Sequence, residues 1–143
     1  MATDPLPADR RSRRVLLVDG DARSSLRLAE LLAEDGYDVE HAADGAEALV
    51  RLAHGPPPDM LVTELSLRVG DGASVARSAR TRSPQLRVVV LTRYVNSVVP
   101  ASFGSPLPVV LGKPLEYERL LAVLEEPADT SAPRATLRTF PAI

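Results

Sequence analysis

Short apolar runs alternate along the chain with segments in which leucine or alanine recurs at helical spacing. Several of the runs are apolar without polar alternation, which is typical of parallel strands covered on both faces. Five runs predict five strands, at 15–18, 37–41, 60–62, 88–91 and 109–111.

The segments between these runs predict helices. Leu28, Leu31 and Leu32 form an i, i+3, i+4 stripe that ends at Asp35-Gly36, a typical glycine stop signal. Similar stripes indicate further helices after Asp44-Gly45, after Asp71-Gly72 and before Pro127.

The connection between the fourth and fifth runs departs from this pattern. It contains several helix-breaking residues, namely Pro100, Gly104, Pro106 and Pro108. A proline inside a helix costs about 3 kcal/mol. We therefore expect the fourth helix to be short or degenerate, with Pro100 in its first turn and nothing helical over 104–108.

A strand followed by a helix, repeated five times, predicts an α/β fold. The expected architecture is a doubly wound, five-stranded parallel sheet with the flavodoxin-like order 2-1-3-4-5. This domain is expected over 14–126. The segments 1–13 and 127–143 are rich in proline, arginine or small polar residues, so we expect flexible tails there. With 143 residues, 45% of them hydrophobic, the chain suits one core and no second domain.

Composition narrows the function classes. Without cysteine the chain has no disulfides, thiolate metal sites or cysteine nucleophiles. No signal peptide and no run of 18 apolar residues is found, so we expect a soluble cytoplasmic protein without a membrane partner. The net charge is −2, so we expect the basic run at 10–14 to be exposed to solvent. No nucleic-acid partner is expected.

Polar residues follow or end four of the predicted strands. In an open α/β sheet the carboxyl ends of the strands form the ligand-binding edge. Lys113 is the single lysine among 17 basic residues, which suggests a role that needs a compact ammonium rather than a planar guanidinium. The candidate site at this edge comprises Asp19, Glu64, Thr92 and Lys113.

Five sequence pieces carry a family resemblance. They are Val-Asp-Gly-Asp (18–21), Pro-Asp-Met-Leu-Val-Thr-Glu-Leu (58–65), Asp-Gly (71–72), Val-Leu-Thr (90–92) and Lys-Pro (113–114). Over about residues 14–126 the chain resembles a response-regulator receiver domain of bacterial two-component signalling. In that family, acids after the first strand and an aspartate ending the third hold Mg²⁺, and a histidine kinase phosphorylates that aspartate. The resemblance implies that Asp19 is the first acid, Thr92 and Lys113 are the phosphoryl-binding residues, and Pro114 is cis.

Four positions depart from the family pattern. Gly20 stands where the second, metal-ligating acid is expected, and Glu64 where the phospho-accepting aspartate is expected. Val110 occupies the position of the aromatic switch residue, and Arg93 replaces a small residue beside the phosphoryl group. We therefore expect Glu64 not to be phosphorylated.

A charge count indicates the consequence for metal binding. Three carboxylates and a lysine would give an empty pocket a charge of −2, whereas Asp19, Glu64 and Lys113 give −1. Mg²⁺ is therefore expected to bind weakly, and no other cofactor is expected. Asp21 is a minor alternative ligand, since its family position is a surface acid.

Glu64 reaches about 1.5 Å further than aspartate, so its carboxylate should contact Lys113 directly. Such an ion pair contributes only about 0–1 kcal/mol to stability. It is therefore no argument that Glu64 imitates an activated, phosphorylated aspartate.

Three functions are compatible with these residues. The favoured one is a stand-alone atypical receiver (pseudo-receiver), a non-enzymatic protein-interaction module in phosphorelay signal transduction. An active phospho-receiver with an unusual Mg²⁺ pocket and a sensor of a small ligand beside Lys113 and Arg93 are the alternatives. The expected partners are a histidine kinase or a downstream regulator, and homodimerisation stays open.

The two histidines are not expected to bind a metal. His41 and His54 have no histidine or carboxylate at the sequence spacing of a metal-ligand pair, and both are expected at the surface.

Overall fold

A parallel β-sheet forms the centre of the computed structural model, which describes residues 13–127 and 139–140. All neighbouring strands pair in parallel, in the order β2-β1-β3-β4-β5-β6. The first five confirm the predicted order 2-1-3-4-5. The strands are β1 (Arg14–Val18), β2 (Asp38–Ala42), β3 (Met60–Glu64), β4 (Arg87–Thr92), β5 (Val109–Gly112) and β6 (Thr139–Phe140).

The sixth strand was not predicted. Thr139 and Phe140 pair with Val110 and Leu111 at the edge of the sheet, within the range expected to be a flexible tail. Two residues are too few to show the alternation or apolar run by which a strand is recognised. The rest of the predicted tails, apart from Arg13 and Pro127, lies outside the described residues.

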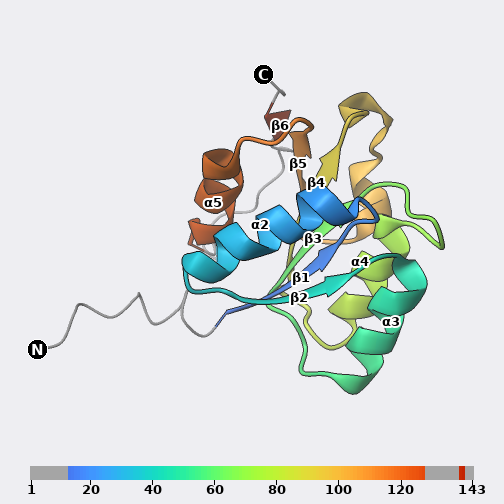
Figure 1. The fold of residues 1–143 in the computed structure, drawn as a ribbon. Helices are drawn as coiled ribbons and strands as arrows, with labels where there is room; N and C mark the ends of the chain where they lie inside the picture. Colours follow the sequence, from blue (N-terminus) through green and yellow to red (C-terminus); the bar gives the residue numbers. More distant parts are fainter. Residues whose placement is uncertain (1–12, 128–138, 141–143) are drawn as a thin grey trace, which may run out of the picture.

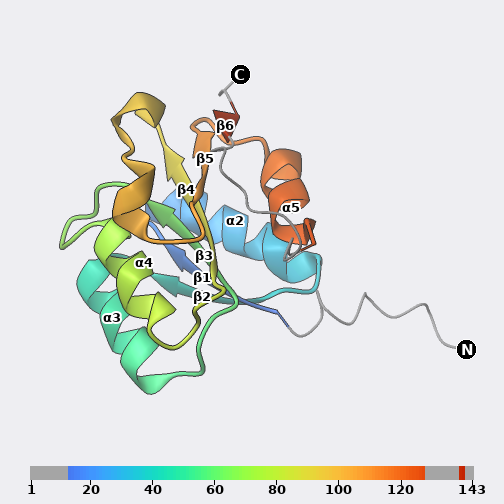
Figure 2. The same cartoon turned by 180° about the vertical axis from the view of Figure 1, so that it is seen from behind.

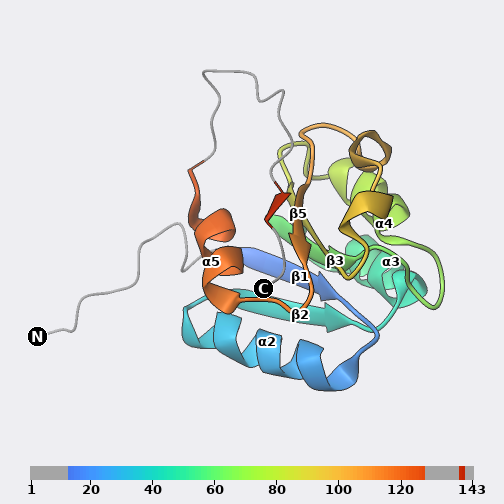
Figure 3. The same ribbon diagram turned by 90° about the horizontal axis from the view of Figure 1, so that it is seen from above.

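Helices cover both faces of the sheet (Figures 1–3). On one face lie α2 (Ala22–Glu34) and α5 (Tyr117–Glu125), and on the other α3 (Gly45–His54) and α4 (Gly72–Arg80). Alternate strand residues serve the two faces: Val15 and Leu17 pack with α2 and α5, whereas Leu16 and Val18 pack with α3 and α4. Covering on both faces explains why the strands read as continuous apolar runs. None of the described helices is long and apolar enough to cross a membrane.

An aspartate side chain caps the start of each of the first three helices. Asp21, Asp44 and Asp71 accept hydrogen bonds from the backbone N–H three residues further on. These bonds satisfy donors that the first turn of a helix leaves free. Asp44 and Asp71 confirm the predicted helix starts, and Gly36, with φ of 96°, ends α2 as expected.

The connection from β4 to β5, which is described in full, contains two short 3₁₀ turns, η1 (Val95–Ser97) and η2 (Pro100–Phe103), in place of a helix. This confirms the expected degenerate fourth helix. Pro100 begins η2, and Gly104 ends it with φ of 85°. Phe103 is fully buried in the core on the side of α3 and α4. Val95 and Val98 of the same connection are partly buried against that core.

Candidate functional site

The carboxyl ends of four strands bring the predicted polar residues to one edge of the sheet. Asp19 follows β1, Glu64 ends β3, Thr92 ends β4 and Lys113 follows β5. Asp19 and Thr92 are buried, with 7% and 1% of their surface exposed. The backbone N–H of Lys113 donates to the carbonyl oxygen of Thr92 at 2.9 Å, which fixes the ends of β4 and β5 to each other.

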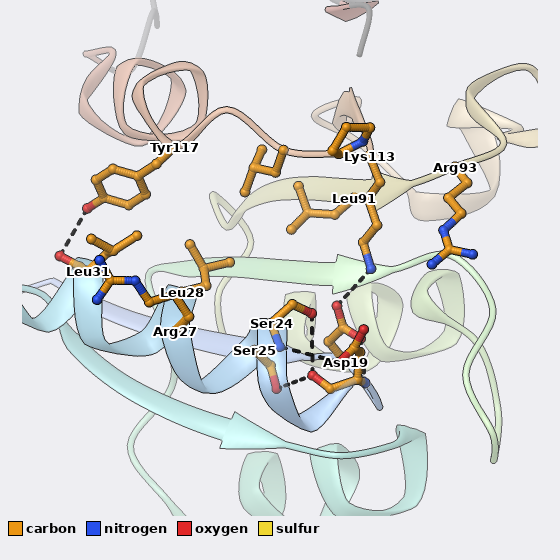
Figure 4. A pocket seen from close by; sticks show the side chains of 13 residues that line it. Asp19, Ser24, Ser25, Arg27, Leu28, Leu31, Leu91, Arg93, Lys113 and Tyr117 are labelled. Carbon is orange, nitrogen blue, oxygen red and sulfur yellow. Dashed lines mark hydrogen bonds and ion pairs between the residues drawn. The ribbon is translucent and has the colours of Figure 1, made fainter. Parts of the chain in front are cut away.

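The ammonium group of Lys113 lies between two carboxylates. Its Nζ is 3.0 Å from Asp19 Oδ2 and 2.9 Å from Glu64 Oε2; Figure 4 shows the first of these contacts. The contact to Glu64 is the one that the longer side chain predicts. Burial acts to lower the pKa of Lys113, but the hydrogen bonds to Glu64 and Asp19 and the negative charges of these carboxylates together outweigh it and hold this pKa above its usual value. The lysine is therefore charged at neutral pH.

All four oxygens of the two carboxylates have a protein partner. Asp19 Oδ1 accepts from the backbone N–H of Asp21 at 2.9 Å, and Glu64 Oε1 accepts from that of Leu65 at 2.8 Å. The other two oxygens contact Lys113. The site is thus a closed network of ion pairs and hydrogen bonds, which we call the Asp19–Lys113–Glu64 triad.

This donor set does not fit a magnesium site. Mg²⁺ requires near-octahedral oxygen ligands, and here an ammonium group already lies between the two carboxylates. Among the described residues no group of three His, Cys, Asp or Glu side chains could hold a metal. The carboxylate of Asp21 caps α2 by accepting from Ser24 N at 3.3 Å, a bond that lowers the pKa of Asp21.

The remaining predicted positions frame the triad. A Cβ added at Gly20 would lie 3.4 Å from the carbonyl oxygen of Ala43, an ordinary contact, so the backbone does not require glycine there. Val110 is fully buried in the core on the side of α3 and α4. The Lys113–Pro114 peptide bond is cis, as the resemblance implies. Thr92 Oγ1 accepts from the backbone N–H of Tyr94 at 3.0 Å.

His41 makes a contact at the site that was not predicted. It was expected at the surface, but it is half-buried, and its Nε2 lies 3.0 Å from the carbonyl oxygen of Asp19. In the register of β1 and β2, His41 pairs with Leu17, next to the strand end that carries Asp19. The pairing of β1 with β2 identifies this histidine as a neighbour of the site. The distance along the sequence between His41 and other metal-ligating residues does not reveal that pairing.

A cavity of about 540 Å³ adjoins the triad, between α2 and the segment that joins β5 to α5 (Figure 4). Arg93 and Lys113 were predicted beside a ligand, but the apolar wall of the cavity was not predicted. Apolar side chains of α2 reach it from one side and those of the β5–α5 segment from the other. Its lining consists of Asp19, Asp21, Ser24, Ser25, Arg27, Leu28, Leu31, Leu91, Arg93, Lys113, Pro114, Leu115 and Tyr117.

Known structures share this architecture. A response regulator receiver protein from Sinorhizobium medicae WSM419 is similar with a TM-score of 0.70 and 29% identity, over 78% of this chain and 90% of that one. The chemotaxis response regulator CheY4 of Vibrio cholerae is similar with a TM-score of 0.69 and 26% identity, over 79% of this chain and 96% of that one.

Sequence relatives agree with this likeness. The response regulator MprA of Mycobacterium bovis BCG Pasteur is 38% identical over 112 residues, which cover 78% of this chain and 48% of the relative. The chain spans about half the length of such relatives. The family model for the response regulator receiver domain matches residues 15–125. The chain therefore belongs to the response regulator receiver domain family.

Proposed function

We propose that this chain is a non-enzymatic receiver domain that acts in the cytoplasm without aspartyl phosphorylation, as a protein-interaction module in phosphorelay signalling. The observation that supports the proposal is the ammonium group of Lys113, held 3.0 Å from Asp19 and 2.9 Å from Glu64. Within this network the position expected to accept a phosphoryl group holds an ion-paired glutamate, and Gly20, which follows Asp19 in the chain, supplies no carboxylate.

Charge supports the same proposal. The triad carries a net charge of −1, and a receiver pocket with three carboxylates and a lysine carries −2. A divalent cation at the triad would have to displace Lys113 and compete with two backbone N–H donors for the carboxylate oxygens. Mg²⁺ is therefore proposed to bind weakly, and Glu64 to hold an ion pair rather than serve as a phosphoryl acceptor.

The proposed partners are signalling proteins, a histidine kinase or a downstream regulator, which would recognise the surface of the domain. The irregular β4–β5 connection supports a recognition surface that differs from a helical one. It exposes three large apolar side chains, Tyr94, Val99 and Leu107. Self-association through the same surface would give a homodimer, which sedimentation of the purified chain measures directly.

Amide NMR spectra with added Mg²⁺, and then with beryllofluoride, test the proposal. Beryllofluoride imitates a phosphoryl group only where a carboxylate and a metal ion are both available. The wild type is expected to show no saturable shifts at Asp19, Glu64, Thr92 or Lys113. Saturable shifts there, abolished by Asp19→Ala, would establish the active phospho-receiver instead.

A double variant serves as the positive control for Mg²⁺ and beryllofluoride binding. Gly20→Asp with Glu64→Asp restores two carboxylates of aspartate length, and the 3.4 Å clearance at Gly20 leaves room for the new Cβ. This variant is expected to respond to Mg²⁺ and beryllofluoride. The matched control, Gly20→Asn with Glu64→Asn, has the same side-chain sizes without the charges and is expected to stay silent.

A further inference from the structure

The cavity beside the triad has the size of a small-molecule site. Its volume is about 540 Å³, within the range of about 300–1,000 Å³ typical of such sites. Leu28 and Leu91 are buried at its wall, and Leu31, Leu115 and Tyr117 are partly exposed around it. The hydroxyl of Tyr117 already donates to Asp35 Oδ2 at 2.6 Å, so this residue offers mainly its ring to the cavity.

The cavity is apolar at one end and polar at the other. Figure 4 shows Tyr117, Leu31 and Leu28 at one end, with Arg27 beside them. Lys113, Arg93 and Asp19 lie at the opposite end. A molecule that fills it would bury an apolar body between α2 and α5 and bring a polar head to the ends of β4 and β5.

The charges that line the cavity are not equally available. Lys113 and Asp19 are paired with each other, and Asp21 caps α2. Arg27 lies 3.4 Å from Glu30 in an exposed pair. Arg93 is exposed, and no ion pair or side-chain hydrogen bond joins it to the part of the chain that the structure describes. Its guanidinium is the cation at this rim that is free to take a ligand.

We propose that this cavity binds a small amphipathic organic anion, with an aliphatic or aromatic body against Leu28, Leu31 and Tyr117 and an oxyanion head on Arg93. A guanidinium group offers paired N–H donors that match the geometry of a carboxylate or phosphate. Binding at Arg93 does not require the ion pairs of the triad to break. Binding would change the α2–α5 surface that a partner meets.

Three probes of related size test the site. Anilinonaphthalene sulfonate carries an aromatic body, decanoate an aliphatic body, and decyltrimethylammonium the same chain length with a positive head. Saturable fluorescence of the sulfonate, displaced by decanoate but not by the cation, is the expected result. Amide shifts are expected to map to the cavity lining. If only one of the two anions binds, the ligand is of that type: aromatic if the sulfonate binds, aliphatic if decanoate binds.

Two variants separate the head from the body of the ligand. Arg93→Gln is expected to weaken decanoate binding about tenfold, the scale of one charge-assisted contact. The matched control is Arg23→Gln, which removes an exposed cation of α2 that does not line the cavity, and it is expected to leave affinity unchanged. Leu31→Trp should fill the apolar end and abolish binding of both anions.

Four results would overturn the proposal. They are no saturable binding at millimolar probe, equal binding of the cationic probe, equal effects of Arg93→Gln and Arg23→Gln, and fluorescence that appears only when the chain self-associates. The last would assign the cavity wall to a second copy of the chain. None of them alters the outcome of the Mg²⁺ and beryllofluoride experiment, so the two proposals fail separately.

Discussion

One ammonium group contacts two carboxylates at the rim of the sheet, and this contact gives a role to the single lysine in a chain whose other basic residues are all arginine. Lys113 reaches both Asp19 and Glu64 through a compact head with three N–H donors. A guanidinium group is larger and planar, which suits flat carboxylate forks rather than the gap between two side chains.

Removing this ammonium group should destabilise the fold at neutral pH. Lys113→Met leaves two carboxylates facing each other without a counter-charge, and we expect the free energy of unfolding in urea to fall by about 1–3 kcal/mol. Arg23→Met, which removes an exposed cation, is the control and should cost less than about 0.5 kcal/mol.

The pH dependence of that loss has a defined sign. The folded-state pKa of Lys113 lies above the unfolded value of 10.5, so its stabilisation is complete below 10.5 and disappears as pH rises through the folded value. The difference between wild type and Lys113→Met should therefore shrink in that alkaline range. A difference that is constant there would show that the ammonium charge is not its source.

Two glycines near the site differ sharply in the room they have. A Cβ at Gly72 would lie 2.5 Å from the carbonyl oxygen of Glu64, whereas one at Gly20 would meet nothing closer than 3.4 Å. Gly72→Ala is expected to lower the free energy of unfolding by about 1–3 kcal/mol and to shift the amide of Leu65. Gly20→Ala should change neither, and similar effects of both variants would contradict this difference in packing.

Phe103 anchors the irregular connection between β4 and β5 to the core. Phe103 is fully buried on a 3₁₀ turn, and Tyr94, in the same connection, is 67% exposed. Phe103→Ala should lower the free energy of unfolding by about 3–5 kcal/mol, because it leaves a cavity in the core beside α4. Tyr94→Ala is the matched control and should cost less than about 0.5 kcal/mol; equal losses would mean that η2 does not support the core.

The elements were predictable where a local signal was strong. Asp44 and Asp71 each precede a glycine and an apolar stripe, and both cap helices. The prolines at 100, 106 and 108 indicated the irregular connection. The strand at 139–140 was not predictable, because its formation depends on a vacant sheet edge rather than on its own sequence.

The strand order predicts which residues of the candidate site lie together, but not the contacts that their side chains make. Placing Asp19, Glu64 and Lys113 on one rim needs the strand order alone, since the carboxyl ends of parallel strands share an edge. The contact from His41 to the backbone of Asp19 and the cavity wall of Leu28, Leu31 and Tyr117 depend on side-chain packing between separate elements. No spacing in the sequence encodes such packing.

The stability of the whole domain provides a test of magnesium binding that needs no assignment of individual signals. A ligand that binds only the folded state at about ten times its dissociation constant stabilises that state by about 1.4 kcal/mol, which raises Tm by about 3–8 °C for a domain of this size. Because Lys113 and two backbone N–H groups already contact the four carboxylate oxygens of the triad, Mg²⁺ at about 10 mM should leave the wild-type Tm unchanged relative to NaCl of equal ionic strength.

The same melting experiment on two variants separates charge from side-chain size. The Gly20→Asp, Glu64→Asp variant should gain several degrees on addition of Mg²⁺, whatever its Tm without metal, because a millimolar site is restored. The Gly20→Asn, Glu64→Asn variant should gain nothing. A Mg²⁺-dependent rise in the wild type would mean that a cation displaces Lys113 from its two carboxylates, and the domain would then have kept the metal dependence of a phosphorylated receiver.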